Sequence, residues 1–224
     1  MRYSFEILII VLLSAPACNK GGATRLCVQN NTTAAFNKGG SFVGIDYDHP
    51  VAKGYWDRTD DLAKGAENCF VVHDVGPDER TWYGIAMLNY DYVGEWKGKV
   101  VLQESEDNHI VMSDANKTYD FRDSIAGDYH FRYIRIVTVN GATVYQNEYM
   151  ITGTVEPDPQ NFLSLLATVP PYFDGKLSFT TDRWALSTAN GEGEMTQGYD
   201  EIHWKVKETV ADSTIYHFFI GHPQ

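Results

Sequence analysis

Short apolar runs separated by turn-forming residues recur along most of the chain, and this pattern predicts β structure. The runs are RLCVQ, GSFVGIDY, NCFVVHDV, TWYGIAMLNYDYV, KGKVVLQ and NHIVMS. Each is rich in β-branched or aromatic residues and is bounded by residues that favour turns. Strands at such close and even spacing are typical of sandwiches and barrels. We expect an all-β fold in the form of an antiparallel β-sandwich. The last part of the chain either belongs to this sandwich or forms a C-terminal β extension to it.

The clearest local signal is FRYIRIVTVNGATVYQNEY, residues 131–149. Asn140 and Gly141 lie between two alternating β-branched runs, and both can adopt positive φ, so the segment predicts a two-residue type I′ hairpin. One face of its first arm carries Tyr133 and Arg135, and the opposite face carries isoleucines. The choice of buried face stays open because both faces are largely apolar.

A second hairpin is predicted in residues 201–222, EIHWKVKETVADSTIYHFFIGH. If Glu208 pairs with Thr214, then His203 and His217 share a face with two lysines, and this cationic face disfavours a zinc site. The opposite, apolar face would carry Trp204, Val206, Tyr216 and Phe218.

One helix is predicted in EPDPQNFLSLLATVPP. Asp158 suits the N-cap and Pro159 suits the first helical position. Two leucines follow Phe162 at distances of three and four residues, as on one face of a helix. We therefore expect one short helix near 159–167, ended by the two prolines after it.

The N-terminus resembles an export signal. A basic residue precedes the apolar run ILIIVLL, and the small residues SAPA follow it. The run is shorter than the roughly 20 residues that a helix needs to span a bilayer. The expected organisation is a signal peptide over 1–17, a tether over 18–24, and a single β-rich domain over 25–224, with a subdivision near 153–160 as the alternative.

The three cysteines are predicted to have two roles. An odd number of cysteines in an exported chain leaves one thiol to be explained. Lipid attachment at Cys18, as in a bacterial lipoprotein, leaves Cys27 and Cys69 as a pair for one disulfide. An ordinary cleavage after Ala17 is the alternative. The bridge would close about 40 residues and stabilise the fold by roughly 3–4 kcal/mol in the chain-entropy model.

The net charge limits the classes of partner that we expect the protein to bind. The formal net charge of −12 argues against nucleic acid and against anionic membrane surfaces, so membrane contact is expected only through an N-terminal lipid anchor. It permits a basic protein partner. Acidic turns raise calcium as a weak alternative to no cofactor. They also raise a hydrolase that works through loop carboxylates, for which the candidates are Asp46, Asp48, Asp57 and Asp61. Ordinary turn chemistry and solubility explain these acids better.

Recognised catalytic motifs do not occur: there is no G-x-S-x-G, phosphate loop or H-E-x-x-H. We therefore assign no catalytic and no metal-ligating residue. Aromatic residues are dense in TWYGIAMLNYDYVGEW, where GEWKG is expected to form a loop that exposes Trp96. Tyr90, Tyr92 and Trp96 would then form a platform for a glycan, a lipid headgroup or a protein.

The order of three segments resembles the front half of actinoporin-like β-sandwiches. These segments are VQNNT, DLAKGAENCFVV and IAMLNYDYVGEWKGKVV, within residues 28–103. The resemblance implies a lipid-headgroup site at Tyr90, Tyr92 and Trp96. The chain lacks the amphipathic N-terminal helix of those cytolysins, so pore formation is not implied.

The expected function is that of a non-enzymatic binding protein, either attached to the bacterial cell envelope as a lipoprotein or secreted. An inhibitor or immunity-type protein that binds a basic enzyme, the headgroup-binding module and the loop-carboxylate hydrolase are the alternatives.

Overall fold

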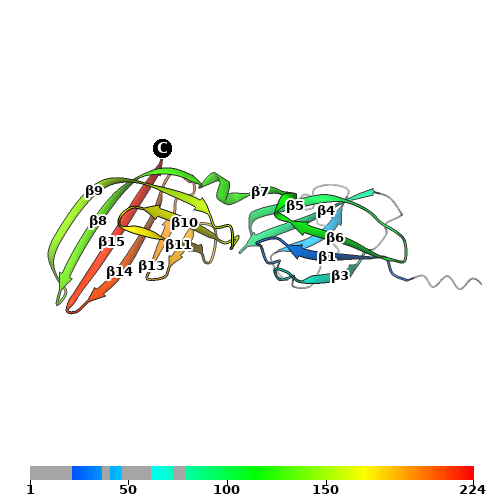
Figure 1. Ribbon diagram of the computed structural model, residues 1–224, viewed down its shortest axis with the longest axis horizontal. Coiled ribbons are helices and arrows are strands. Elements are labelled where there is room, and N and C mark those ends of the chain that lie inside the picture. The colour runs from blue at the N-terminus through cyan, green and yellow to red at the C-terminus, as the bar shows by residue number, and fades with distance from the viewer. Residues whose placement is uncertain (1–21, 37–40, 47–61, 73–78) are drawn as a thin grey trace, which may run out of the picture.

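A computed structural model describes residues 22–36, 41–46, 62–72 and 79–224 and shows an elongated all-β molecule (Figure 1). Two sheets at one end form a first body, and a closed barrel forms the other end. One short 3-10 segment, Phe121–Ser124, lies between the last strand of the first body and the first strand of the barrel. Among the described residues, no helix has the length and apolar character that crossing a membrane requires.

The first body consists of two sheets that pack face to face. One has the order β3-β1-β6 and the other β2-β4-β5-β7. Met112 from the first sheet contacts Gly84 on the second, beside Phe36. The elements are β1 (Arg25–Asn31), β2 (Phe42–Asp46), β3 (Glu67–Val71), β4 (Glu79–Leu88), β5 (Asp91–Val101), β6 (Asp107–Ser113), η1 (Asp114–Asn116), β7 (Lys117–Asp120) and η2 (Phe121–Ser124).

The remaining strands close into an antiparallel barrel in the order β10-β11-β12-β13-β14-β15-β8-β9. Antiparallel β structure is thus confirmed, but a barrel takes the place of the expected sandwich over this part of the chain. The strands are β8 (Gly127–Val139), β9 (Ala142–Pro157), β10 (Ser164–Val169), β11 (Phe173–Phe179), β12 (Ala185–Thr188), β13 (Gly191–Met195), β14 (Ile202–Val210) and β15 (Ser213–Pro223).

The helix predicted near 159–167 is wrong. Asp158 does accept a hydrogen bond from the backbone N–H of Gln160, but it caps a turn. From Ser164 the chain forms β10, which pairs with β9 and β11. Leu165 and Ala167 are buried while the residues between and after them are exposed, so period-two burial in the barrel outweighs the helical spacing of the leucines.

The hairpin at Asn140-Gly141 is confirmed. Both residues have positive φ, 50° and 80°, and Val139 pairs with Ala142 across them. The two arms run on as β8 and β9, the longest strands of the barrel. They project beyond its closed part together with β14 and β15 (Figure 1).

The register predicted for the last hairpin is wrong by one residue. Thr209 pairs with Thr214, so Val206 lies opposite His217 and Lys205 opposite Phe218. Because neighbouring side chains alternate between faces, this slip exchanges the faces of every residue on β15 relative to β14. His217 therefore joins the inner face, while Phe218 lies on the outer face beside Lys205.

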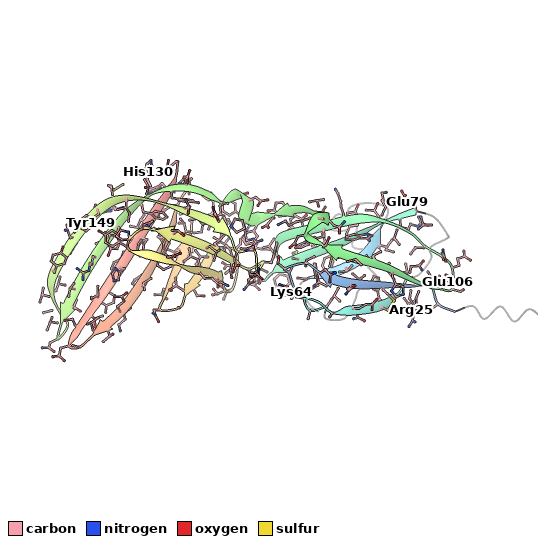
Figure 2. All side chains as sticks on the ribbon, in the orientation of Figure 1. Arg25, Lys64, Glu79, Glu106, His130 and Tyr149 are labelled. Atoms are coloured by element: carbon pink, nitrogen blue, oxygen red, sulfur yellow. A yellow bond between two sulfur atoms is a disulfide. The ribbon has the colours of Figure 1, made fainter. Side chains whose placement is uncertain are left out.

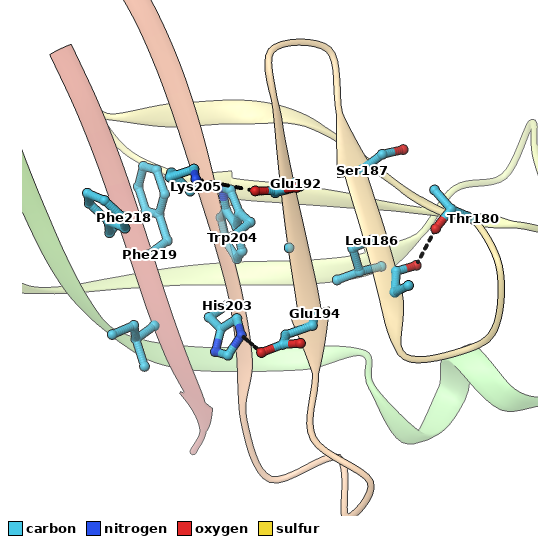
Figure 3. A pocket seen from close by; sticks show the side chains of 13 residues that line it. Thr180, Leu186, Ser187, Glu192, Glu194, His203, Trp204, Lys205, Phe218 and Phe219 are labelled. Atoms are coloured by element: carbon cyan, nitrogen blue, oxygen red, sulfur yellow. Dashed lines mark hydrogen bonds and ion pairs between the residues drawn. The ribbon is translucent and has the colours of Figure 1, made fainter. Parts of the chain in front are cut away.

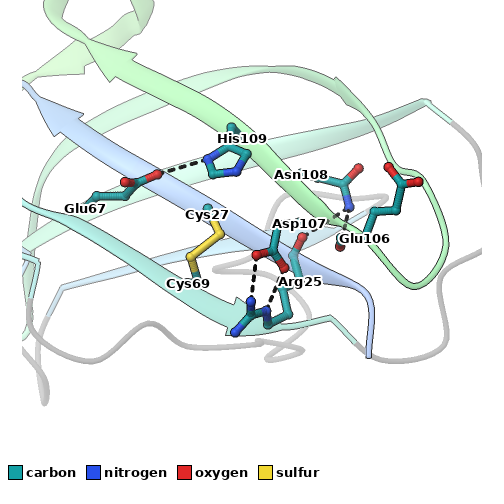
Figure 4. The surroundings of a disulfide bond; sticks show 8 residues. All are labelled: Arg25, Cys27, Glu67, Cys69, Glu106, Asp107, Asn108 and His109. Atoms are coloured by element: carbon teal, nitrogen blue, oxygen red, sulfur yellow. Dashed lines mark hydrogen bonds and ion pairs between the residues drawn. A yellow bond between two sulfur atoms is a disulfide. The ribbon is translucent and has the colours of Figure 1, made fainter. Parts of the chain in front are cut away.

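The disulfide between Cys27 and Cys69 is confirmed. The two residues are a directly opposed pair on β1 and β3, 42 positions apart in the sequence, with Cα atoms 3.9 Å apart (Figure 4). The bridge joins the central strand of its sheet to an edge strand. Arg25 and Asp107 form a two-pronged ion pair between β1 and β6 nearby.

Arg122 on η2 fastens the two bodies together. Its guanidinium is almost fully buried and pairs with the carboxylate of Asp120 at the end of β7. Its Nη1 also donates to three backbone carbonyls at the base of the barrel, those of Asp158, Asn161 and Ser164. The ring of Phe162 covers the guanidinium at 4.7 Å.

Acid should weaken this junction. Burial alone would raise the pKa of the Asp120 carboxyl, but hydrogen bonds from Arg122 and Lys117 outweigh burial and hold the pKa below its usual range. A group with a lowered folded-state pKa stabilises the fold above its unfolded pKa of about 4, and that stability is lost as pH falls. Urea unfolding should therefore show lower stability at pH 3 than at pH 7, and Asp120→Asn should flatten the difference. An unchanged pH dependence in that variant would exclude Asp120 as a contributor.

Candidate functional site

The three aromatic residues expected to form a binding platform lie in different environments. Tyr90 occupies the tight turn between β4 and β5 with a positive φ and is 85% exposed. Tyr92 is half-buried, stacks on Tyr119 and donates a hydrogen bond to Glu95. Burial and this bond raise the pKa of Tyr92. The structure therefore does not bring the three together on one surface.

Trp96 corrects the sequence-based expectation most clearly. It lies within β5 rather than in an exposed loop, and none of its surface is accessible. Its ring packs between Phe36 and Phe162 at centroid distances of 5.4 and 5.0 Å. Its indole N–H donates to Asp114. Since ligands cannot reach it in this fold, its role is to pack the core beside the junction.

Several other sequence-based candidates cannot be placed. The signal segment, Cys18, Asp48, Asp57 and Asp61 lie outside the described residues, and for Asp46 only the backbone of β2 is described. Within the described ranges, no three His, Cys, Asp or Glu side chains gather in a way that could hold a metal ion.

The outer face of the barrel carries a hollow of about 730 Å³ over β12 to β15 (Figure 3). Phe218 contributes an apolar patch to it. Its charged side chains already have partners, because Lys205 pairs with Glu192, and His203 lies 2.8 Å from Glu194. A ligand would have to break these pairs to use their charges, so this hollow is not a prepared polar site.

The free end of the barrel offers such a site. Four strands project beyond the closed part of the barrel here: β8, β9, β14 and β15. The side chains on the inner faces of their projecting parts are half-buried or exposed. Cross-strand pairing places Asn147, Arg135 and His217 in one row, between a row that starts at Tyr149 and one that starts at Tyr145. We call this set the mouth cluster: Arg135, Tyr145, Asn147, Tyr149, Tyr172 and His217.

Two of its aromatic rings, those of Tyr149 and Tyr172, are nearly parallel. Tyr172, from the turn between β10 and β11, stacks on buried Tyr133 with centroids 4.2 Å apart. Tyr149 lies 6.0 Å from both rings, with interplanar angles of 20°. Tyr145, Tyr149 and Tyr172 remain 42%, 38% and 37% exposed. Figure 2 shows Tyr149 at the end of the molecule farthest from Arg25 and Glu106.

Asn147 organises two of the phenols. Its side-chain amide donates to the hydroxyl groups of Tyr145 and Tyr149, which flank it on the same face of β9. A hydrogen bond from Tyr149, with help from Asn147 and the charge of Arg135, lowers the pKa of Tyr145. The same bond raises the pKa of Tyr149. The polar edge of the cluster is thus held in place before any ligand arrives.

Beneath the cluster, Tyr133 connects to His217. Burial raises the pKa of Tyr133 to about 12. Its hydroxyl is hydrogen-bonded to Nδ1 of His217 at 2.8 Å. Nε2 of the same imidazole lies 3.5 Å from the carboxylate of Glu208. These contacts hold the imidazole ring of His217 nearly parallel to the ring of Tyr133, at an angle of 21°.

The sequence pattern missed this site for two reasons. Both faces of residues 131–149 are apolar enough to be buried, so alternation alone does not show that Tyr145 and Tyr149 face inward. The one-residue error in the last hairpin also placed His217 on the outer face. The signal that could have found the site is the Y-x-N-x-Y spacing of Tyr145, Asn147 and Tyr149, since residues two apart share a face of a strand.

Comparisons with known proteins do not extend these observations. No family model matches the chain, no curated protein matches it, and no solved structure matches it.

Proposed function

We propose that this is an exported, non-enzymatic binding protein of the cell envelope that takes a saccharide at the mouth cluster. The observation that carries the proposal is a group of three partly exposed tyrosines. The rings of Tyr149 and Tyr172 are nearly parallel, and the hydroxyl groups of Tyr145 and Tyr149 accept hydrogen bonds from the amide of Asn147.

The chemistry of the cluster suits a sugar ring. One side of a pyranose ring carries C–H bonds that pack on the negative face of an aromatic ring, while its hydroxyl groups need donors and acceptors around the edge. Tyrosine supplies both an apolar face and a polar hydroxyl group. Asn147 adds an amide and Arg135 adds a guanidinium at the same rim. All of these groups lie on strands or on a short turn, so they lose little conformational entropy when a ligand binds.

Other ligand classes fit less well. A small apolar molecule needs an enclosed cavity that buries most of its surface, whereas the cluster lies on the open inner face of projecting strands. Stacking tyrosines also suit nucleic-acid bases. The net charge of −12, however, opposes binding to a phosphate backbone.

The position of the cluster fits attachment at the other end of the chain. The first described residues lie at the tip of the first body (Figure 1), and Tyr149 of the mouth cluster lies at the opposite end of the molecule (Figure 2). If Cys18 carries a lipid, the binding site faces away from the membrane. The intact mass of the mature protein should then equal a chain that begins at Cys18, plus lipid, minus two hydrogens for the disulfide. An unmodified mass would exclude the anchor.

Tyr149→Ala and Tyr172→Ala should each weaken saccharide binding at least tenfold, or about 1.4 kcal/mol. Each change removes a ring face that the sugar packs against, and the thermal midpoint should change little because both side chains are more than one-third exposed. A glycan array identifies the saccharide, and calorimetric titration measures the affinities.

Two control variants match these changes. Met150→Ala alters the neighbour of Tyr149 on the outer face of the same strand, where Met150 is 71% exposed, and Tyr90→Ala removes an exposed tyrosine from the first body. Both should bind like the unaltered protein. Loss of binding in Tyr90→Ala with full binding in Tyr149→Ala would move the site to the first body and reject the proposal.

A further inference from the structure

We propose that the saccharide bound at the mouth cluster carries an oxyanion, a carboxylate or a sulfate, and that Arg135 recognises it. This inference rests on the proposed function and names the class of sugar within it.

Arg135 has no acidic partner in the part of the chain that the structure describes. Among the described residues it forms no ion pair, in contrast to Arg132 on the opposite face of β8, which holds Glu148 through two hydrogen bonds. The guanidinium of Arg135 lies over the ring of Tyr145, with its central carbon 5.7 Å from the ring centroid. It is thus held at the edge of the aromatic cluster and keeps its hydrogen-bond donors for another group.

The surroundings of Arg135 do not neutralise it. Its direct neighbours across the sheet are the amide of Asn147 and the imidazole of His217. The acid on this face, Glu208, is on β14, separated from β8 by β15, and lies against His217. The guanidinium therefore lies at the centre of the row, between an amide and an imidazole, and no carboxylate of the described residues pairs with it.

Guanidinium chemistry sets the kind of ligand. Its planar donors match the two oxygens of a carboxylate or a sulfate, and such paired, charge-assisted bonds are among the strongest hydrogen bonds. A neutral sugar would leave this cation half-buried and unpaired. A sugar that stacks on Tyr149 or Tyr172 and bears an oxyanion would occupy both parts of the cluster. Arg135 is therefore the residue that selects charged sugars over neutral ones.

The probes are oligosaccharides of galacturonic acid, glucuronic acid and sulfated galactose, each paired with the neutral oligosaccharide of the same linkage. The unaltered protein should bind the charged member of at least one pair ten times or more tightly than the neutral one. Comparing carboxylated with sulfated members shows which oxyanion is preferred. Arg135→Gln should bring the charged sugar down to the affinity of the neutral one, and Arg135→Lys should recover part of the difference. Arg132→Gln, on the outer face of the same strand, should keep the full preference.

Three other results would overturn the role of Arg135 or the proposed function itself. Equal affinity of the unaltered protein for both members of the bound pairs would overturn the role of Arg135 and leave saccharide binding intact. A preference that survives in Arg135→Gln, with the fold checked by circular dichroism, would also overturn it. If neither charged nor neutral sugars bind, the proposed function falls and takes this inference with it.

Discussion

Trp96→Ala should lower the free energy of unfolding by about 3–5 kcal/mol, the range for removing a large buried aromatic side chain. Trp96 is fully buried between Phe36 of the first body and Phe162 of the segment that connects β9 to β10 in the barrel. Its loss would leave a cavity where the two bodies meet, and Asp114 would lose the donor that Trp96 supplies. Urea unfolding followed by circular dichroism measures the change.

The matched control is Tyr90→Ala, which removes an aromatic side chain only six positions away. Because Tyr90 is 85% exposed, its removal should change stability by no more than about 0.5 kcal/mol. If Trp96→Ala were as stable as Tyr90→Ala, Trp96 would not be a core residue and would not hold the two bodies together.

Arg122→Met should be similarly damaging, with an expected loss of about 3–5 kcal/mol. Methionine keeps much of the side-chain volume but leaves the buried carboxylate of Asp120 with only Lys117 as a charged partner. Three backbone carbonyls at the base of the barrel also lose their donor. Buried acceptors without partners are costly, so the loss comes from desolvated groups as well as from the ion pair.

Arg132→Met is the control for charge alone. The Arg132–Glu148 pair is about half exposed, and pairs of this kind contribute at most about 1 kcal/mol. Equal losses in Arg122→Met and Arg132→Met, measured by urea unfolding, would contradict the fastening role of Arg122.

Local signals in the sequence predicted local structure well. Asn140 and Gly141 define a tight turn because their backbone tolerates positive φ, and the structure confirms that turn. Cys27 and Cys69 are predicted to pair because lipid attachment at Cys18 accounts for the odd cysteine, and the structure joins them. The turn depends on its own two residues, whereas the disulfide also depends on the pairing of β1 with β3.

The sequence-based predictions were wrong where contacts between residues far apart in the sequence determine the structure. The leucines after Phe162 have helical spacing, but pairing with β9 and β11 makes that segment a strand. Trp96 follows a glycine and a glutamate as a loop residue would, yet packing against Phe162 places it in the core. Spacing of strands does not distinguish a sandwich from a barrel, because closure depends on which strands meet at the end of the chain.

The mouth cluster could not have been assembled from the sequence for the same reason. It combines Tyr145 and Tyr149 from β9, Arg135 from β8, Tyr172 from a turn and His217 from β15. These residues meet only when β15 pairs with β8 in the observed register and closes the sheet. A one-residue shift removes His217 from the set.

The most direct test of saccharide binding at the mouth cluster is fluorine NMR of the protein labelled with 3-fluorotyrosine, during titration with the tightest-binding sugar from the array. The resonances of Tyr145, Tyr149 and Tyr172, assigned by tyrosine-to-phenylalanine variants, should shift with saturation, and that of Tyr90 should stay in place. A saturating shift confined to Tyr90 and Tyr92, with the three cluster resonances unmoved, would contradict the account.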